Sequence, residues 1–323
     1  MQQAIILREP GPPSVLKAES IQVGDPGPGQ ARIRQTWIGV NFHDCYVRSG
    51  LYKTLPLPGI PGLEGVGVVE SVGADVTGVK AGDRVSYLTN KYGGYASDRL
   101  IDADLLVKLP GTLDDRTIAA TFLRGLTALM LVDDVFAVKA GHTVLVHAAA
   151  GGVGRYVCQL AKNRGATVIG TVGSEAKAEL AKKAGCDHTI LYRSENFVER
   201  VREITGGKGV NVAYDSVGKD TFQGSLEALA MRGHLVNFGQ ASGPIEPFQI
   251  SQLFGKSNTV SRPAVFHYFV GEDREKMASR LYAALEKGVM SADLVHEYAL
   301  ADAGQAHADL EARKTTGAVL LKV

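Results

Sequence analysis

The first third of the chain consists of short apolar or alternating segments separated by Gly and Pro, which is typical of the strands of a small β-barrel. The clearest is Ala31–Trp37, in which Arg32, Arg34 and Thr36 alternate with mostly apolar positions. The same pattern predicts a short helix at His43–Ser49 and further strands at Ala4–Leu7, Gly65–Ser71, Asp83–Leu88 and Tyr95–Ile101.

The pattern changes near Arg116, where a helix is predicted over Ile118–Val132 and helices and strands then alternate. Strands are expected at Thr143–His147, Thr167–Val172, Thr189–Tyr192, Val210–Tyr214 and Leu235–Phe238. The helices between them are expected at Val153–Arg164, Glu175–Ala184, Asn196–Thr205 and Phe222–Met231. Such alternation predicts an α/β fold, a doubly wound parallel sheet with helices on both faces.

After about Gly255 the alternation ends, and helices at Asp273–Lys287 and Ala303–Arg313 precede a last strand at Gly317–Val323. A chain of 323 residues is long enough for two domains.

Composition narrows the function classes. The net charge is +1, with Lys and Arg interspersed among Asp and Glu, so no basic stripe favours nucleic acid or a membrane surface as a partner. No apolar run is long enough to span a bilayer, and the first residues do not resemble a signal peptide. The three cysteines are far apart in sequence and predict no disulfide framework. These features predict a cytoplasmic protein.

A glycine-rich turn follows the strand that begins at Thr143. The sequence AAAGGVG aligns with the G-x-G-x-x-G pattern through Ala149, Gly151 and Gly154. In this pattern small residues allow a tight turn, close approach of the backbone to a pyrophosphate, and close packing of the helix. We therefore expect the cofactor phosphates to contact the backbone of the four residues Ala150, Gly151, Gly152 and Val153.

The end of the second strand indicates which dinucleotide binds. It reads Thr171-Val172-Gly173-Ser174 and has no carboxylate at the tip to bind the 2′-hydroxyl of NAD. Lys177, one turn into the next helix, can reach a 2′-phosphate, and the hydroxyl of Tyr192 can add a donor. A solvated helix lysine is the alternative for Lys177 alone, and Glu175 is a counter-argument unless it points away. Together with Gly173 and Ser174, these residues predict NADPH.

Ligands of open parallel sheets lie at the carboxyl ends of the strands. The loops after the fourth and fifth strands, with Ser216 in one and Phe238, Gly239 and Gln240 in the other, are expected to line the nicotinamide half of the cofactor. Ordinary loops without a ligand are the alternative.

Several segments together resemble a known family. HAAAGGVG, YDSVG, ITGGKGV, VNFHDCYVRSGLY, PGLEGVGVVESVG and AGDRV are similar to the zeta-crystallin-like quinone oxidoreductases, the zinc-free branch of the medium-chain dehydrogenase/reductase superfamily. The resemblance covers the whole chain. It implies that a Rossmann domain, residues 123–261, is inserted in a GroES-like β-barrel catalytic domain, residues 1–122 and 262–323. The terminal strand is then expected to return to the N-terminal barrel. The resemblance also implies an active site in the cleft between the two domains, and a homodimer. A strand near Val260 could pair across the two-fold axis.

The resemblance also implies that no catalytic metal binds. Zinc-dependent relatives have a Cys at the position of Asn41 and a His at the position of Leu63, and neither present residue replaces such a ligand. His43, Asp44 and Cys45 are contiguous and cannot surround one ion.

Without a metal, the favoured chemistry is hydride transfer to an electron-poor acceptor such as a quinone or an α,β-unsaturated carbonyl. The resemblance assigns Tyr52 as the proton donor, with Asn41 and Tyr46 lining the same pocket. Packing against the pocket wall remains the alternative for both tyrosines. Asn41 is also expected to contact the cofactor ribose. Further cofactor contacts are expected from Thr127, Arg262 and Arg313.

Two other functions stay open. One is reduction of the double bond of an alkenal, enone or enoyl thioester by NADPH on the same scaffold. The other is a role in binding NADPH or RNA without turnover, against which the lack of a basic patch argues.

Overall fold

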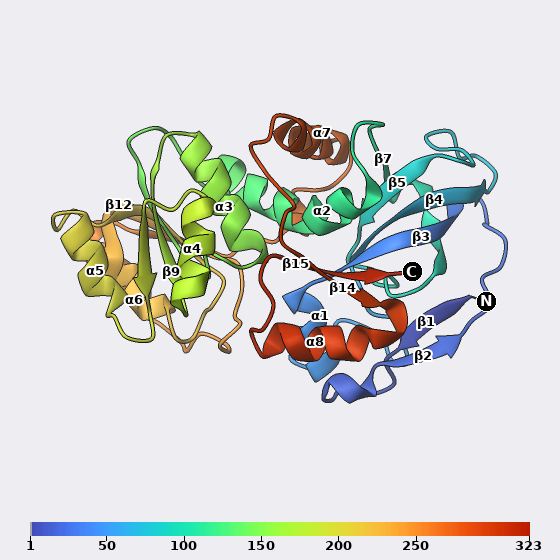
Figure 1. Cartoon of the computed structure of the whole chain (residues 1–323), viewed down its shortest axis with the longest axis horizontal. Helices are drawn as coiled ribbons and strands as arrows, with labels where there is room; N and C mark the ends of the chain where they lie inside the picture. The colour runs from blue at the N-terminus through green and yellow to red at the C-terminus, as the bar shows by residue number, and fades with distance from the viewer. Residues whose placement is uncertain (1) are drawn as a thin grey trace. The chain divides into compact units, whose positions relative to one another are not determined.

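The computed structural model of the chain describes residues 2–323 and contains two compact units. Unit 1 comprises the chain up to Leu123 together with Phe269–Glu286 and Ala292–Val323, and unit 2 comprises Arg124–Tyr268 and Lys287–Ser291. In Figure 1 the blue N-terminal and red C-terminal segments accordingly belong to the same unit. The domain boundaries near residues 122 and 262 stay a prediction, because compactness alone does not establish independent folding.

Unit 1 is built on a seven-stranded sheet in the order β14-β15-β3-β4-β5-β7, with β6 also paired to β3 and with a separate β1-β2 pair. Its strands are β1 (Gln3–Ile6), β2 (Lys17–Ser20), β3 (Gln30–Val40), β4 (Glu64–Val72), β5 (Arg84–Leu88), β6 (Asp98–Asp102), β7 (Leu106–Lys108), β14 (Val295–Ala299) and β15 (Ala318–Lys322). Its helices are α1 (Phe42–Ser49), α7 (Asp273–Glu286), α8 (Ala303–Glu311) and the first part of α2 (Asp115–Leu129).

Strand β3 organises this sheet. Its apolar positions Ala31 and Ile33 are fully buried with Val85 and Tyr87, as the alternating pattern predicts. The last strand, β15, pairs antiparallel with β3, with Leu320 opposite Gly39. The predicted return of the C-terminus to the N-terminal sheet is therefore confirmed.

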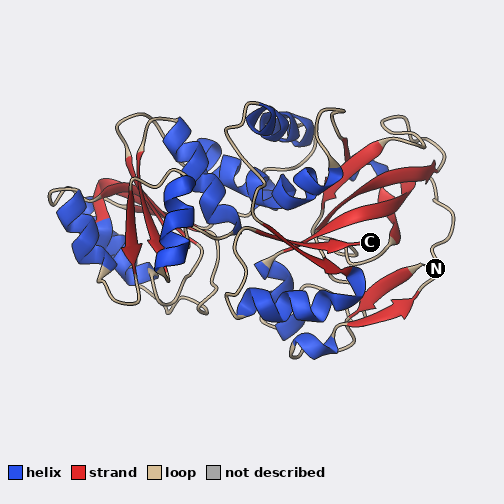
Figure 2. Ribbon diagram, in the orientation of Figure 1, coloured by secondary structure: helices blue, strands red, loops and turns tan. Residues whose placement is uncertain are grey.

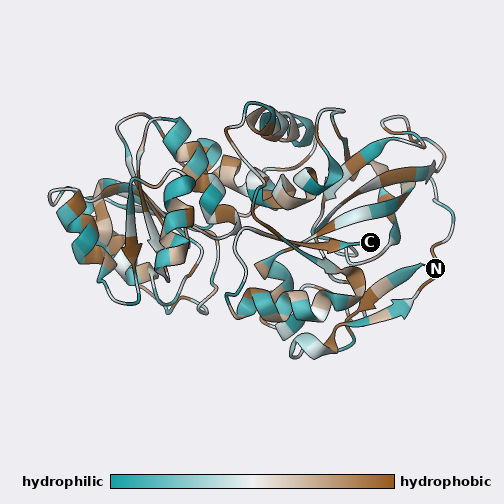
Figure 3. Cartoon of the chain, viewed as in Figure 1, coloured by the Kyte–Doolittle hydropathy of each residue, from teal (hydrophilic) through white to brown (hydrophobic). Residues whose placement is uncertain are grey.

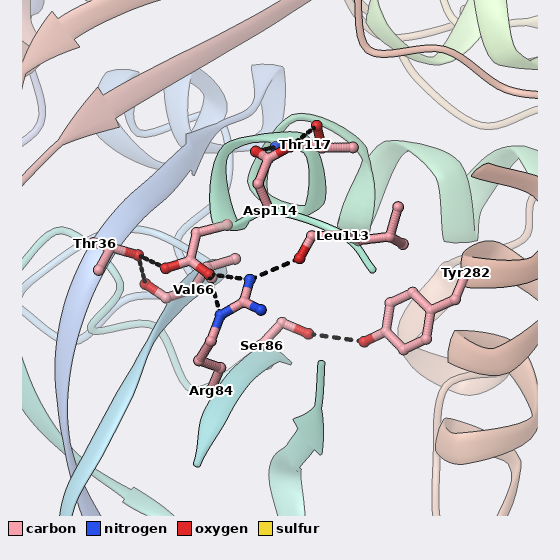
Figure 4. Close-up of polar contacts among 9 residues, drawn as sticks. Thr36, Val66, Arg84, Ser86, Leu113, Asp114, Thr117 and Tyr282 are labelled. Carbon is pink, nitrogen blue, oxygen red and sulfur yellow. Dashed lines mark hydrogen bonds and ion pairs between the residues drawn. The ribbon is translucent and has the colours of Figure 1, made fainter. Parts of the chain in front are cut away.

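The start of α2 is fixed to the sheet of unit 1 by side chains (Figure 4). The guanidinium of Arg84 on β5 donates to Asp115 Oδ1 from Nε at 2.8 Å and from a terminal nitrogen at 2.6 Å. The hydroxyl of Thr36 on β3 donates to Asp115 Oδ2 at 2.8 Å. Asp114 accepts the backbone N–H of Thr117 at 2.8 Å and so satisfies one of the free donors of the first turn. These bonds fix the first part of α2, which belongs to unit 1; the rest of the helix, from Arg124, belongs to unit 2.

Unit 2 contains a six-stranded, wholly parallel sheet in the order β10-β9-β8-β11-β12-β13. Its strands are β8 (Thr143–Val146), β9 (Thr167–Val172), β10 (His188–Leu191), β11 (Val210–Asp215), β12 (Leu229–Asn237) and β13 (Thr259–Ser261). Its helices are α3 (Gly152–Asn163), α4 (Glu175–Lys183), α5 (Phe197–Ile204) and α6 (Phe222–Ala228). Figure 2 shows the red strands of this sheet among blue helices, and the predicted α/β class is confirmed.

Hydrophobic contacts account for the stability of this sheet. Leu145, Ile169, Ile190, Ala213 and Leu235, one from each of five strands, are fully buried in one cluster. In Figure 3 the helices of unit 2 show brown and teal segments in alternation, as expected of helices with one face on a sheet.

The structure corrects one predicted helix. The helix expected over Phe222–Met231 ends at Ala228, and β12 already begins at Leu229. Leu229 pairs with Val210 of β11, and the register between these strands then shifts. Arg232 has a positive φ of 58°, which is compatible with a strand irregularity but not with a helix. Pairing with β11 therefore overrides the local helical pattern.

A second difference concerns the helix predicted over Ile118–Val132. It begins earlier, at Asp115, and its last part becomes a π-helical segment over Met130–Val135. Among residues 2–323 there is no helix with the length and apolar character to cross a membrane.

Replacement of Asp115 should destabilise unit 1. Asp115→Ala removes the acceptor of two Arg84 bonds and one Thr36 bond, and we expect the free energy of unfolding to fall by about 1–3 kcal/mol. Urea unfolding measures the change. Arg8→Ala, which breaks an exposed ion pair with Glu19, is the control and should change stability by less than about 1 kcal/mol. Equal effects of both variants would contradict the anchoring role of Asp115.

Candidate functional site

The turn after β8 is shaped for close approach of a ligand to the backbone. Ala148 has a φ of 52°, and α3 begins four residues later at Gly152. A Cβ on Gly154 would collide with the carbonyl of Ala148, so only glycine lets the first turn of α3 lie this close. The N-terminus of α3 is formed by the four predicted residues: Ala150 and the N-cap Gly151 precede the helix, and Gly152 and Val153 are its first two residues. A helix N-terminus favours negative charge.

The end of β9 brings together the residues predicted for a 2′-phosphate. Ser174 is the N-cap of α4, and its Oγ accepts the backbone N–H of Lys177 at 3.4 Å. The hydroxyl of Tyr192 lies over Gly173, where an added Cβ would be 3.0 Å from it. Glu175, the first residue of α4, is exposed. Lys177 and Tyr192 therefore flank the same short loop, which has no carboxylate at its tip.

Buried polar side chains hold the loops after β11 and β12. Asp215 Oδ1 accepts the N–H groups of Val217 and Gly218 at 2.8 and 3.0 Å. The amide of Asn237 donates to the carbonyl of Gly239 at 3.0 Å. These contacts fix the backbone on both sides of the predicted residue Ser216.

The two loops also touch each other. An added Cβ on Gly239 would be 2.7 Å from the Ser216 carbonyl oxygen. Phe238 and Gln240 adjoin this contact in the chain. Arg262 is exposed, and its guanidinium donates a hydrogen bond to Asn237 Oδ1. Sequence reasoning missed Asn237, and no sequence motif marks it.

In unit 1, Asn41 is the N-cap of α1 and is held by two carboxylates. Its amide donates to Glu64 Oε1 at 2.8 Å, and its backbone N–H donates to Asp44 Oδ2 at 2.8 Å. The other oxygen of Glu64 accepts the N–H of Leu123 at 2.8 Å. Gly39 leaves the space that Glu64 occupies, because a Cβ there would collide with the carboxylate. The position of Asn41 is thus determined by buried contacts rather than by solvent.

Tyr46 and Tyr52 form an aromatic cluster with His43. The ring centres of Tyr46 and Tyr52 are 5.0 Å apart, and those of His43 and Tyr52 are 5.1 Å apart. The backbone N–H of Tyr52 donates to the carbonyl of Tyr46 at 3.0 Å. The structure therefore brings the two predicted tyrosines together and adds His43 beside them.

The remaining predicted cofactor residues lie elsewhere. Thr127 is buried in the part of α2 that belongs to unit 2. Arg313 is exposed in unit 1, just after α8, with a φ of 58°. The predicted residues are therefore divided between the units: Asn41, Tyr46, Tyr52 and Arg313 belong to unit 1, and the others belong to unit 2.

The residues at the zinc positions do not fit the metal. Leu63 is apolar and 1% exposed, and the amide of Asn41 is bonded to Glu64. Within residues 2–323, no three His, Cys, Asp or Glu side chains are grouped to hold an ion. The donor set that zinc requires is therefore not provided at this place.

His147, at the end of β8, has a structural role. It is buried between Thr171 Oγ1 and Ser225 Oγ, each 2.9 Å from a ring nitrogen. Burial lowers its pKa, so the imidazole is neutral at pH 7 and bonds both neighbours.

Comparisons with known proteins agree over nearly the whole chain. The family model described as alcohol dehydrogenase GroES-like domain matches residues 27–111, and the model described as zinc-binding dehydrogenase matches residues 152–284. A quinone oxidoreductase of Pseudomonas aeruginosa is 44% identical over 316 residues, 96% of each chain. A 2-haloacrylate reductase of a Burkholderia species is 42% identical and covers 99% of each chain.

Structural likeness is equally extensive. The crystal structure of Escherichia coli quinone oxidoreductase complexed with NADPH superimposes with a TM-score of 0.97 at 41% identity and covers all of both chains. The fold is thus a GroES-like domain with a Rossmann domain, as the resemblance implies. The chain belongs to the quinone oxidoreductase family of the medium-chain dehydrogenase/reductase superfamily.

Proposed function

We propose that this protein is an NADPH:quinone reductase. The observation that carries the proposal is the likeness, over nearly the full length, to quinone oxidoreductases, one of which is described with NADPH bound. The contacts of the described residues support the assignment on both the cofactor side and the acceptor side.

The cofactor side fits NADPH. The glycine turn before α3 leaves room for a pyrophosphate at backbone N–H groups. At the end of β9, the Lys177 ammonium and the Tyr192 hydroxyl are the groups that would hold a 2′-phosphate. Ser216, Phe238, Gly239, Gln240 and Thr127 would line the nicotinamide half, and Arg262 and Arg313 would add positive charge.

On the acceptor side we place Tyr52, Tyr46 and Asn41. NADPH, when bound, supplies the hydride. The phenol of Tyr52 is the candidate to hydrogen-bond the acceptor oxygen as its charge grows and to give it a proton. Glu64 engages one N–H of the Asn41 amide, which fixes the orientation of this side chain for a contact with acceptor or ribose.

We further propose that the reaction needs no metal. The support is the donor chemistry at Asn41 and Leu63, described above. A quinone is already electron-poor, so its reduction does not require a Lewis acid.

Reduction of an activated double bond is the second candidate. Its support is the 2-haloacrylate reductase among the relatives, because it is as similar in identity and coverage as the quinone oxidoreductases. The same cofactor residues and Tyr52 would serve this reaction.

We expect a homodimer in the cytoplasm. Strand β13 lies at the edge of the sheet of unit 2, and the preceding segment Ile250–Lys256 exposes Ile250 by 80% and Phe254 by 89%. A second copy of the chain would cover such an edge and such side chains. All three cysteines are free, which is typical of a reducing compartment.

The acceptor is tested by NADPH oxidation at 340 nm with 1,4-benzoquinone and a short 2-alkenal in parallel. We expect a higher kcat/KM with the quinone. A higher value with the alkenal would move the function to double-bond reduction.

Tyr52→Phe should lower kcat for the alkenal more than for the quinone. Reduction of the alkenal double bond includes protonation of a carbon atom, and this step needs an acid in the site.

Lys177→Ala should raise the KM for NADPH by about ten- to a hundredfold and leave that for NADH nearly unchanged, since only NADPH has the phosphate. Lys182→Ala removes a lysine of the same helix that forms an ion pair with Glu179, and it is the matched control. An equal loss for both cofactors in the Lys177 variant would remove this lysine from the phosphate site.

Prolonged treatment with a zinc chelator, followed by removal of the chelator, should leave kcat unchanged. Metal analysis of the purified protein should find less than about one-tenth of a zinc ion per chain, because the ligand positions are not filled. Activity that is lost and returns with added zinc would refute the metal-free mechanism.

A further inference from the structure

Tyr92 has an unusual backbone in unit 1. It lies between β5 and β6, is 4% exposed, and has a φ of 59°, a left-handed conformation that bulky residues rarely adopt. The segment after it is fixed, because Gly93 N–H donates to Ile60 O and Tyr95 N–H to Pro61 O, both at 2.8 Å. The fold therefore maintains a disfavoured conformation that turns this side chain inward.

The hydroxyl of Tyr92 joins three segments of the chain. His43 Nε2, on α1, is 3.1 Å from it, and Thr54 Oγ1, in the loop after α1, is also hydrogen-bonded to it. A phenol has one donor and can accept further bonds, so it can satisfy both partners at once. Tyr92 thus connects the β5–β6 loop to α1 and to the loop that contains Tyr52.

The His43 ring is uncharged at neutral pH, which suits hydrogen bonding to the neutral Tyr92 hydroxyl. Burial lowers the pKa of His43 to about 4, so the ring is neutral at pH 7, with one nitrogen as donor and the other as acceptor. A neutral chain of hydrogen bonds through Tyr92 to Thr54 therefore persists across the physiological pH range.

The hydrogen-bonded group of Tyr92, His43 and Thr54 contacts Tyr52 through the His43 ring. The His43 ring meets the Tyr52 ring edge-on at an interplanar angle of 71°, and Tyr46 packs on Tyr52 at 58°. Rotation of His43 would alter the first of these contacts. The orientation of the Tyr52 ring is thereby coupled to the hydroxyl of Tyr92, although the two tyrosines are 40 positions apart in sequence.

We propose that Tyr92 is a positioning residue: its hydroxyl, bonded to His43 and Thr54, fixes the loop and ring that orient Tyr52 toward the acceptor. The proposal rests on the assignment of Tyr52 to the acceptor site made above. It adds that His43 and Tyr92 act on acceptor binding through Tyr52, so that their variants should leave cofactor binding unchanged.

Kinetics of hydroxyl removal test the proposal. Tyr92→Phe keeps the ring and the backbone and should raise the KM for the preferred acceptor about three- to tenfold, while the KM for NADPH stays unchanged. Tyr298→Phe, which removes a tyrosine hydroxyl bonded to Asp309, is the matched control and should change neither constant. Unchanged acceptor kinetics in Tyr92→Phe would overturn the proposal.

The partner residue gives a second comparison. His43→Leu removes both the bond to Tyr92 and the ring contact with Tyr52, so it should raise the KM for the acceptor at least as much as Tyr92→Phe. His43→Gln, whose amide can bond the same hydroxyl, should recover part of the loss. The double variant of His43→Leu and Tyr92→Phe should be little worse than His43→Leu alone, because the His43–Tyr92 bond is already lost in that variant. Fully additive losses would overturn the coupling.

A spectroscopic measurement separates this proposal from the quinone assignment. With 3-fluorotyrosine in place of Tyr52, the fluorine resonance should be single in the otherwise unchanged protein and should shift or broaden in Tyr92→Phe. An identical resonance would contradict positioning, whatever the activity. If the unaltered protein oxidises NADPH with neither acceptor, the quinone assignment fails, and the resonance still decides the role of Tyr92.

Discussion

The arrangement of unit 2 depends on how closely the first turn of α3 approaches the end of β8. Gly154 lies against the Ala148 carbonyl, and any larger residue would push the helix away. On the neighbouring strand, an added Cβ on Gly170 would be 2.6 Å from the Ala149 side chain. Because the residues at this contact are glycines and alanines, the backbone N–H groups at the start of α3 are not covered by large side chains. This packing leaves room for a phosphate at the backbone, and we propose that the neighbouring end of β9 selects the dinucleotide.

In unit 1, buried hydrogen bonds rather than a glycine-rich turn position the predicted site residues. Its candidate acceptor residues are positioned by buried polar bonds between segments far apart in the chain, rather than by a short motif. Glu64 connects Asn41 to the backbone of Leu123, and Asp44 connects α1 to the Tyr95 hydroxyl at 3.1 Å and to the N–H of Asn41. Such networks stabilise one arrangement because each buried polar atom costs free energy when its partner is lost. They give the predicted acceptor side a rigid base.

The sequence predicts features whose causes are local, and it fails where the causes are distant. The glycine turn at Ala149–Gly154, the start of α4 at Glu175 and most strands of the parallel sheet follow from short patterns, and the structure has them. The end of α6 at Ala228 could not be predicted, because pairing of Leu229 with Val210 decides it. The bond between His43 and Tyr92 was likewise hidden, since 49 positions separate them and Tyr92 belongs to none of the segments that carry the resemblance. The roles of the predicted site residues stay predictions until ligands are bound.

The central claim is that the end of β9 selects NADPH. Its most direct test is a fluorescence titration of the purified protein with NADPH and with NADH under the same buffer and salt. We predict that NADPH binds at least about tenfold more tightly, because a charge-assisted bond to the 2′-phosphate is present in that complex alone. Equal affinities, or tighter binding of NADH, would contradict the account of this site.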